Sequence, residues 1–131
     1  METKAKEVRS DGAPRPVGPY SQAVVSHGLV FASGQIPLDP ETNALVPGEI
    51  EAQTERVLAN LKAVLEAAGS SLDRVVRTTV YLADLGLFVR MNAVYSRHFR
   101  ADPKPARSTI QAARLPLGAA IEIDAIATLD E

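Results

Sequence analysis

The stretch KPARSTIQAARLP, residues 104–116, places an arginine in a segment whose pattern predicts a strand. Alternate residues of a strand share a face, so we expect Arg107 to share its face with Thr109. The planar guanidinium of an arginine can hold a carboxylate through two parallel hydrogen bonds. Taken alone, Arg107 is more simply explained as a surface residue of an edge strand, or as the partner of an internal ion pair with Glu122 or Asp124.

A second charged side chain, Glu122, lies inside the apolar run AAIEIDAIA. Strand alternation places Ile121 and Ile123 on one face, and Glu122 on the other face with Asp124. A carboxylate in a partly desolvated cleft can position a water molecule or transfer a proton. Taken alone, the pattern is more simply explained as a solvated strand face.

Three further positions carry groups that could line such a cleft. Tyr20 follows a Gly-Pro pair, a rigid turn that could aim the ring at a site, although simple packing also explains it. Asn92 lies on the apolar stripe of a predicted helix, where a buried amide needs either a structural partner or a ligand. Ser33 and Gly34 end a predicted strand, where a glycine lets a ligand approach the backbone or marks a β-bulge.

Length and composition limit the classes of protein that these residues could serve. The 131 residues fit a single domain, residues 1–131, with residues 1–13 as a flexible or extended N-terminal segment. A net charge of -2 without a cluster of Lys and Arg argues against a nucleic-acid partner. No apolar run could act as a membrane span or a signal peptide, so we expect a cytoplasmic protein with no membrane partner.

The motifs give no support to metal or cofactor chemistry. The absence of cysteine excludes disulfides, thiolate catalysis and Cys-ligated metals. No phosphate-binding loop and no dinucleotide fingerprint is found, and the two histidines, His27 and His98, lie far apart in the sequence. We therefore expect no metal and no cofactor.

The elements that must position these residues follow from hydrophobic periodicity. Two strands joined by a turn at Ser26-His27-Gly28 are followed by a helix over Ile50–Ala68 that ends before Gly69. A strand within residues 74–84 is expected to place Val76 on one face with Thr78, Val80 and Leu82. A second helix over Leu87–Phe99 and two further strands complete the order β-β-α-β-α-β-β.

This order predicts an α+β fold, a mixed β-sheet with two helices packed on one face. The other face of the sheet also needs a cover, because the strands carry apolar side chains on both faces. Association with other subunits would provide that cover.

The order of the motifs along the chain resembles the RidA (YjgF/UK114) family, the reactive intermediate deaminases. The run PARSTIQAARLPLGAAIEIDAIA is similar to the family signature. The stretches GPYSQAV, FASGQIP, VVRTTVYLADL and MNAVYSRHF extend the resemblance over nearly the whole chain from about residue 14 onward. The resemblance implies a chorismate-mutase-like fold of the YjgF type and a homotrimer with three clefts between subunits.

The resemblance also implies a reaction. Relatives hydrolyse enamines and imines, such as 2-aminoacrylate released by pyridoxal-phosphate enzymes, to 2-keto acids and ammonia without a cofactor of their own. By the same resemblance, Arg107 would bind the substrate carboxylate and Glu122 would orient or activate the attacking water. Matching positions that would line the cleft or contact the substrate are Tyr20, Ser33, Gly34, Asn92 and Thr109, the last standing where many relatives carry a cysteine.

Three alternatives use the same residues. A trimer could bind 2-keto acids or other small carboxylates without turning them over. A holdase or ribonuclease role has been proposed for some relatives. A deaminase specialised for a 2-aminomuconate-like catabolic intermediate would keep the chemistry and change the substrate. The sequence leaves open the substrate side chain, the pathway and the group that protonates the leaving amine.

Overall fold

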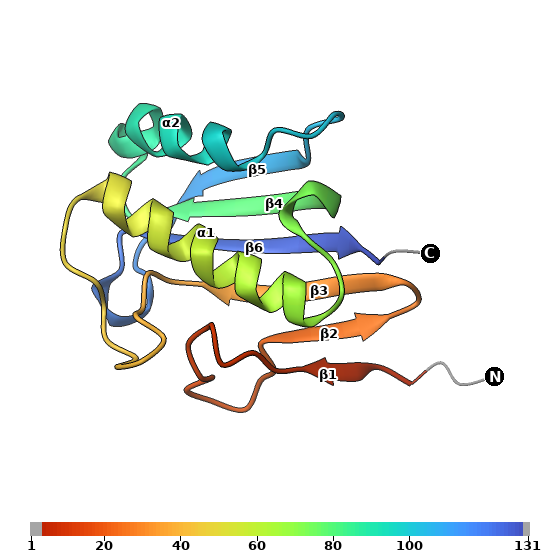
Figure 1. Cartoon of the computed structure of the whole chain (residues 1–131). Helices are drawn as coiled ribbons and strands as arrows, with labels where there is room; N and C mark the ends of the chain where they lie inside the picture. The colour runs from red at the N-terminus through yellow and green to blue at the C-terminus, as the bar shows by residue number, and fades with distance from the viewer. Residues whose placement is uncertain (1–3, 130–131) are drawn as a thin grey trace.

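The structure, a computed structural model, describes residues 4–129. Six strands form one mixed sheet in the order β1-β2-β3-β6-β4-β5, and both helices cover the same face of it (Figure 1). The predicted α+β architecture is therefore confirmed. The elements are β1 (Lys6–Val8), β2 (Ala23–Ser26), β3 (Leu29–Gln35), α1 (Ile50–Ala67), β4 (Val75–Leu82), α2 (Phe88–His98), β5 (Ala106–Gln111) and β6 (Ile121–Thr128).

The predicted hairpin turn and helix end are both confirmed. His27 and Gly28, between β2 and β3, have φ values of 54° and 76°, as in the two-residue turns that fit the twist of a hairpin. Gly69 follows α1 with φ 90°, and the Ser70 N–H donates to the Leu65 carbonyl at 2.9 Å. This arrangement satisfies a carbonyl that the end of the helix would otherwise leave unpaired.

The core lies between the sheet and the helices. The apolar stripe of α1, formed by Val57, Leu58, Leu61, Val64 and Leu65, is buried, and only Ala68, just beyond the helix, is partly exposed. The inward face of β6 is formed by Ile121, Ile123, Ala125 and Ala127. Strand β6 lies between β3 and β4 and is antiparallel to both, whereas β4 and β5 are parallel. A parallel pair needs a crossover, and α2 provides it. No helix within residues 4–129 combines the length and the apolar composition needed to cross a membrane.

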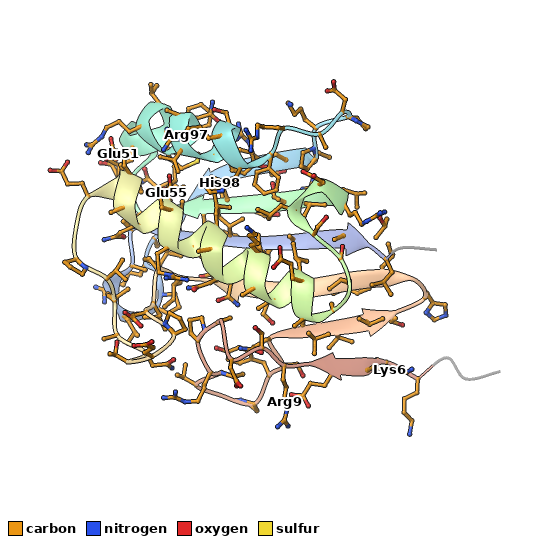
Figure 2. The ribbon with its side chains drawn as sticks, viewed as in Figure 1. Lys6, Arg9, Glu51, Glu55, Arg97 and His98 are labelled. Carbon is orange, nitrogen blue, oxygen red and sulfur yellow. The ribbon has the colours of Figure 1, made fainter. Side chains whose placement is uncertain are left out.

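Ion pairs join the two helices on their outer side (Figure 2). Glu55 of α1 accepts hydrogen bonds from Arg97 at 2.9 Å and from His98 at 2.8 Å. Burial opposes ionisation of Glu55, but the hydrogen bonds and positive charges of Arg97 and His98 together outweigh it and lower the pKa of the carboxyl. Nearer the start of α1, Arg90 binds Glu51 at 2.7 Å, and this hydrogen bond lowers the pKa of Glu51 to about 2. These largely exposed ion pairs add a small contribution to the packing of α2 beside α1.

The N-terminal segment contributes a strand that the predicted order lacks. Residues 6–8 form β1, which pairs with β2 at the edge of the sheet, while residues 1–3 of the predicted segment lie outside the described residues. Three residues are too few to show an alternating pattern. These residues form a strand because they pair with β2, which is a tertiary contact.

The predicted place of Val76 in the buried row of β4 is wrong. The pairing of β4 with β6 slips between Val75 and Arg77, where two residues of β4 oppose one of β6. This β-bulge turns Val75 into the core, with 5% of its surface exposed, and leaves Val76 46% exposed. Strict alternation holds only after the bulge.

The sheet face opposite the helices is uncovered in a single chain (Figure 1). Alternation places Phe31 of β3 and Ile110 of β5 on it, and the bulge adds Val76 of β4. Each of the three is more than 40% exposed. We call this surface the open face. Exposed apolar side chains on one sheet face agree with the expectation that this face needs a cover.

One buried side chain, Gln22, binds the segment after β1 to the sheet. Its amide oxygen accepts from the Ser10 N–H at 2.7 Å, and its amide nitrogen donates to the carbonyls of Pro14 at 2.9 Å and Ser10 at 3.1 Å. Gln22 is only 5% exposed, so these backbone groups have little access to water. The Gln22 amide therefore holds residues 10–14 of the chain leading to Tyr20, and the Asn43 amide binds both backbone groups of Arg15 further along.

We expect Gln22→Ala to lower the free energy of unfolding by about 1–3 kcal/mol, because buried backbone groups lose their partner. Urea unfolding measures the loss, and hydrogen exchange should rise over residues 6–14. The control is Gln111→Ala, whose exposed side chain accepts one hydrogen bond, from Leu85 N–H, and should cost less than about 0.5 kcal/mol. Equal losses in the two variants would contradict this role of Gln22.

Candidate active site

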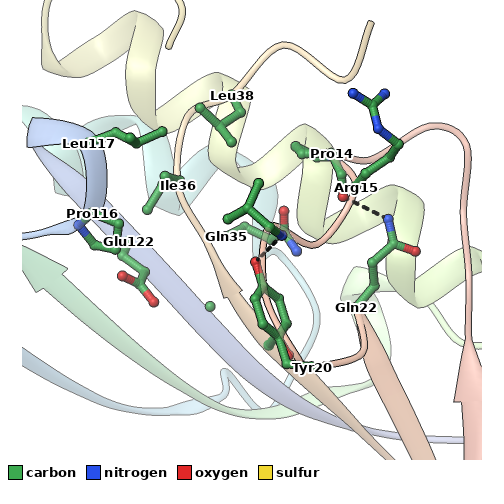
Figure 3. Close-up of a pocket in the computed structure, with 13 residues that line it drawn as sticks. Pro14, Arg15, Tyr20, Gln22, Gln35, Ile36, Leu38, Pro116, Leu117 and Glu122 are labelled. Carbon is green, nitrogen blue, oxygen red and sulfur yellow. Dashed lines mark hydrogen bonds between the residues drawn. The ribbon is translucent and has the colours of Figure 1, made fainter. Parts of the chain in front are cut away.

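Four of the predicted site residues line one hollow of about 390 Å³, which we call the Glu122 hollow. They are Tyr20, Ser33, Gly34 and Glu122. Glu122 of β6 and Tyr20 of the loop before β2 lie on two sides of this space (Figure 3). Much of the remaining wall is apolar and is formed by Pro14, Val17, Ile36, Leu38, Pro116 and Leu117. The hollow thus combines one carboxylate with a largely apolar wall.

Gly34 and Glu122 are in close contact across β3 and β6. A Cβ atom on Gly34 would lie 1.9 Å from Oε2 and 2.8 Å from Cδ of Glu122, distances at which side chains cannot coexist. The pairing of β3 with β6 is also irregular here, between Ala32 and Gln35, so the alternative of a β-bulge is confirmed. The space expected above Gly34 for a ligand is therefore occupied by the Glu122 carboxylate.

The surroundings of Glu122 favour its protonated form. Burial raises the pKa of Glu122, and the negative charge of Asp124, two residues along the same face, raises it further. Asp124 accepts a hydrogen bond from the Tyr81 hydroxyl at 3.0 Å. Within residues 4–129 no group of three His, Asp or Glu side chains is arranged to hold a metal ion. A carboxyl with a raised pKa can accept a proton and return it at a pH closer to neutrality.

Local hydrogen bonds fix Tyr20 and Ser33. The Tyr20 hydroxyl accepts from the Val17 N–H at 3.4 Å, which leaves the ring half-exposed at the rim of the Glu122 hollow. The Ser33 hydroxyl donates to the Ser21 carbonyl at 2.6 Å, and the Ser33 N–H donates to the Gln22 carbonyl at 2.9 Å. Both the hydroxyl and the backbone N–H of Ser33 are thus already paired within the chain.

Arg107 lies in a second hollow, lined by Asn92, Tyr95, Ser96, Phe99, Lys104, Pro105 and Arg107, which we call the Arg107 hollow. Arg107 Nη1 donates to Asn92 Oδ1 at 2.7 Å. The guanidinium carbon lies 4.7 Å from the centre of the Tyr95 ring and 5.5 Å from that of Phe88. Among residues 4–129 Arg107 forms no ion pair with a carboxylate, so most of its donors remain available.

Arg107 and Glu122 lie on opposite faces of the sheet. Arg107 pairs with Thr78, which faces the core, and contacts α2, so its side chain lies on the helix side. Glu122 pairs with Tyr81, on the open face. The alternative of an ion pair between Arg107 and Glu122 or Asp124 is therefore wrong within one chain. A single chain carries two separate half-sites, the Glu122 hollow and the Arg107 hollow.

Thr109 and Asn92 lie on the same side of the sheet as Arg107, the side covered by the helices. Thr109 pairs with Val80 of β4, which places it on the helix side with Arg107 but outside the lining of either hollow. Asn92 has a structural partner in Arg107, so the structural alternative for this amide is confirmed. The strand pattern places Thr109 on the same face as Arg107, and the helix pattern places Asn92 on the apolar stripe. Neither pattern could show that α2 lies against β5.

Three residues around Arg107 were missed by the sequence reasoning. The rings of Tyr95 and Phe88 lie against its guanidinium, and Thr78 binds the Tyr95 hydroxyl at 2.7 Å. Tyr95 and Phe88 lie on the predicted apolar stripe of α2, a pattern that indicates burial but not a cationic neighbour. The sequence offered one indication: Phe88 and Tyr95 lie four and three residues from Asn92, so the three side chains share one side of the helix.

Comparison with known proteins supports one family. A family model described as Endoribonuclease L-PSP matches residues 10–129. The chain belongs to this family, the Rid (YjgF/UK114) family. The Reactive Intermediate Deaminase A of Arabidopsis thaliana chloroplasts is 49% identical over 126 residues, which cover 96% of this chain and 67% of the relative.

Solved structures of the Rid family share the fold. A Thermotoga maritima protein described as a candidate endoribonuclease is 54% identical with a TM-score of 0.92, over 96% of this chain and 98% of that chain. The Escherichia coli protein TdcF, crystallised with bound serine, is 39% identical with a TM-score of 0.90, over 95% of this chain and 99% of that chain. The predicted family and fold are confirmed, and family membership supports a reactive-intermediate deaminase function at the family level.

We expect the Glu122→Gln variant to be more stable than the wild type at pH 7. The folded state raises the pKa of Glu122, so between the ordinary glutamate pKa and the raised one the folded chain binds more protons than the unfolded chain. The free energy of unfolding of the wild type therefore falls as pH rises from the ordinary glutamate pKa through the raised one, and the variant lacks this loss. Melting temperatures at pH 4 and pH 7 test this, with Glu66→Gln, an exposed residue of α1, as the control. A wild type that gains stability relative to Glu122→Gln between pH 4 and pH 7 would contradict the raised pKa.

Proposed function

We propose that this Rid family member hydrolyses imines and enamines of 2-amino acids, such as 2-iminobutanoate, 2-iminopropanoate and 2-aminoacrylate, to 2-keto acids and ammonia. The observation that carries the proposal is Arg107. It is partly buried, its guanidinium is fixed by Asn92 and two rings, and it has no carboxylate partner among the described residues. A fixed cation without an internal anion is suited to bind the carboxylate of a substrate.

The proposal includes a homotrimer, because the two half-sites cannot meet in one chain. The open face carries exposed apolar side chains that a neighbouring subunit would cover. If the neighbouring subunit covers this face with its own β5–α2 edge, its Arg107 hollow would lie beside the Glu122 hollow of the first chain. Each complete site would then take its cation from one subunit and its carboxylate from the next.

The chemistry that such a site must supply is modest. An enamine first becomes an imine when its β-carbon gains a proton and its nitrogen loses one. Water then adds to the imine carbon while the nitrogen gains a proton. The carbinolamine collapses to the keto group and releases ammonia. Glu122 would take a proton from the attacking water and return it to the leaving nitrogen, which suits its raised pKa. Binding the substrate carboxylate at Arg107 would contribute orientation, part of the ~7–11 kcal/mol that proximity can supply.

Other functions have less support. Binding of a 2-keto acid without turnover would use Arg107 but would give Glu122 and its raised pKa no role. Cleavage of RNA, which the family description suggests, is disfavoured by the net charge of -2, because RNA binding relies on an excess of positive charge. A 2-aminomuconate-like substrate would place an extra carboxylate in the site, and the cations that line the two hollows besides Arg107 are Arg15 and Lys104. Neither is among the residues that hold Arg107 in place. We place the activity in the cytoplasm as part of the same proposal.

Arg107→Ala should reduce kcat/KM by at least about 30-fold, because the substrate carboxylate loses a desolvated partner. Arg107→Lys keeps the positive charge but loses the two parallel N–H donors of the guanidinium, so KM should rise by about tenfold. The assay generates an imine from leucine or methionine with an amino-acid oxidase and measures how far the protein suppresses its capture by semicarbazide. The matched control is Arg114→Ala, an exposed arginine outside both hollows. Near-normal turnover by Arg107→Ala would overturn the assignment.

Mixing two inactive variants should restore activity if each site spans two subunits. In trimers refolded from equal amounts of Arg107→Ala and Glu122→Gln, a site is intact only when both its contributing chains carry the native residue. Random mixing makes that true for roughly a quarter of sites, so roughly a quarter of wild-type turnover is expected. In the control, Arg107→Ala is mixed with the double variant Arg107→Ala/Glu122→Gln. No chain in that mixture has a native Arg107, so no site can be rebuilt. Mixed trimers without recovered turnover would contradict the shared site.

A further inference from the structure

The ring of Tyr95 is the nearest aromatic contact of the Arg107 guanidinium. The guanidinium carbon lies over this ring, 4.7 Å from its centre, and Phe88 contributes a second ring at 5.5 Å. The five N–H donors of a guanidinium lie in its plane, while its faces are weakly hydrated. A ring against the guanidinium restricts it through a cation–π contact and leaves N–H donors for a carboxylate.

Tyr95 is itself held by contacts on two sides. Its hydroxyl forms a 2.7 Å hydrogen bond with the hydroxyl of Thr78, a residue with 0% exposed surface on β4. Its ring lies 4.4 Å from that of Phe99, at an interplanar angle of 31°. Tyr95 is only 7% exposed, and burial raises the pKa of its phenol, so the ring stays neutral.

The register of the parallel strands links these contacts. Thr78 and Arg107 are directly paired in β4 and β5. The Tyr95 hydroxyl is therefore anchored to the strand neighbour of the arginine that its ring supports. Asn92, one turn earlier on α2, accepts from Nη1 and fixes the rotation of the guanidinium within its plane.

We propose that Tyr95, anchored by Thr78, is a positioning residue that holds the Arg107 guanidinium with its free donors directed toward the substrate carboxylate. The inference rests on the proposed function, because that function assigns the carboxylate to Arg107. Tyr95 acts through Arg107, so removing its ring weakens carboxylate binding and leaves the proton transfers at Glu122 unchanged.

The test measures binding of 2-oxobutanoate by titration calorimetry and KM and kcat in the imine assay. Tyr95→Leu should weaken 2-oxobutanoate binding and raise KM by about 3- to 30-fold, with kcat changed much less. Thr78→Val keeps the ring and Arg107 but removes the anchor, and should weaken binding by about two- to tenfold. This second variant keeps the proposal testable if Tyr95→Leu does not fold.

The control is Val94→Ala, which removes buried atoms from the same helix outside both hollows. It should lower the melting temperature and leave 2-oxobutanoate binding unchanged. If Tyr95→Leu and Thr78→Val bind 2-oxobutanoate as the wild type does, or if Val94→Ala weakens binding as much as they do, Tyr95 is merely structural and the inference is wrong.

A double-mutant cycle with Arg107→Lys separates this inference from the proposed function. Action through the guanidinium predicts that Tyr95→Leu costs less affinity in the Arg107→Lys background than in the wild type. Equal costs in both backgrounds would overturn the inference alone. Unchanged 2-oxobutanoate binding and unchanged turnover in Arg107→Ala would instead overturn the proposed function.

Discussion

The alternation of side chains across a β-strand is the constraint on which the rest of this structure depends. Successive residues point to opposite faces, and the registers of β4 with β5 and with β6 place Arg107 beside Thr78 and Glu122 beside Tyr81. Thr78 is buried under the helices, whereas Tyr81 belongs to the open face. The cation and the carboxylate are thus separated by the sheet itself. No change of rotamer could bring them together in one chain, which is why the proposed chemistry requires two subunits.

Each half-site has its own physical character. Around Glu122, burial and the nearby charge of Asp124 favour the neutral carboxyl, and the missing side chain of Gly34 leaves the space in which that carboxyl lies. Around Arg107, one amide and two aromatic rings hold a cation without neutralising it. One half-site therefore destabilises a negative charge, and the other keeps a positive charge available. A substrate with a carboxylate next to an imine carbon matches this pair, because it needs an anion receptor and a proton-transfer group at neighbouring positions.

The crossover between the parallel strands explains how the arginine half-site is assembled. Helix α2 connects β4 to β5 and must return over the sheet, so its inner side lies above the start of β5. Its packing is also supported from outside by the ion pairs of Glu55 with Arg97 and His98. Tyr95 and Asn92, three residues apart on this helix, consequently approach Arg107 from one direction. The contact is a product of topology as much as of residue type.

The amino-acid sequence by itself determined the elements and the residues with chemical potential. Periodicity and turn residues identified both helices, the hairpin at His27-Gly28 and the inward face of β6, since local propensity and burial agree there. Only the tertiary structure decided the contacts that cross between elements. Strand β1 needed β2 as its partner, the bulge at Val75–Arg77 needed the register with β6, and the support of Arg107 by Tyr95 and Thr78 needed α2 above β5. Such contacts depend on pairing between segments that are distant in the sequence, and a local pattern does not identify the segment with which it pairs.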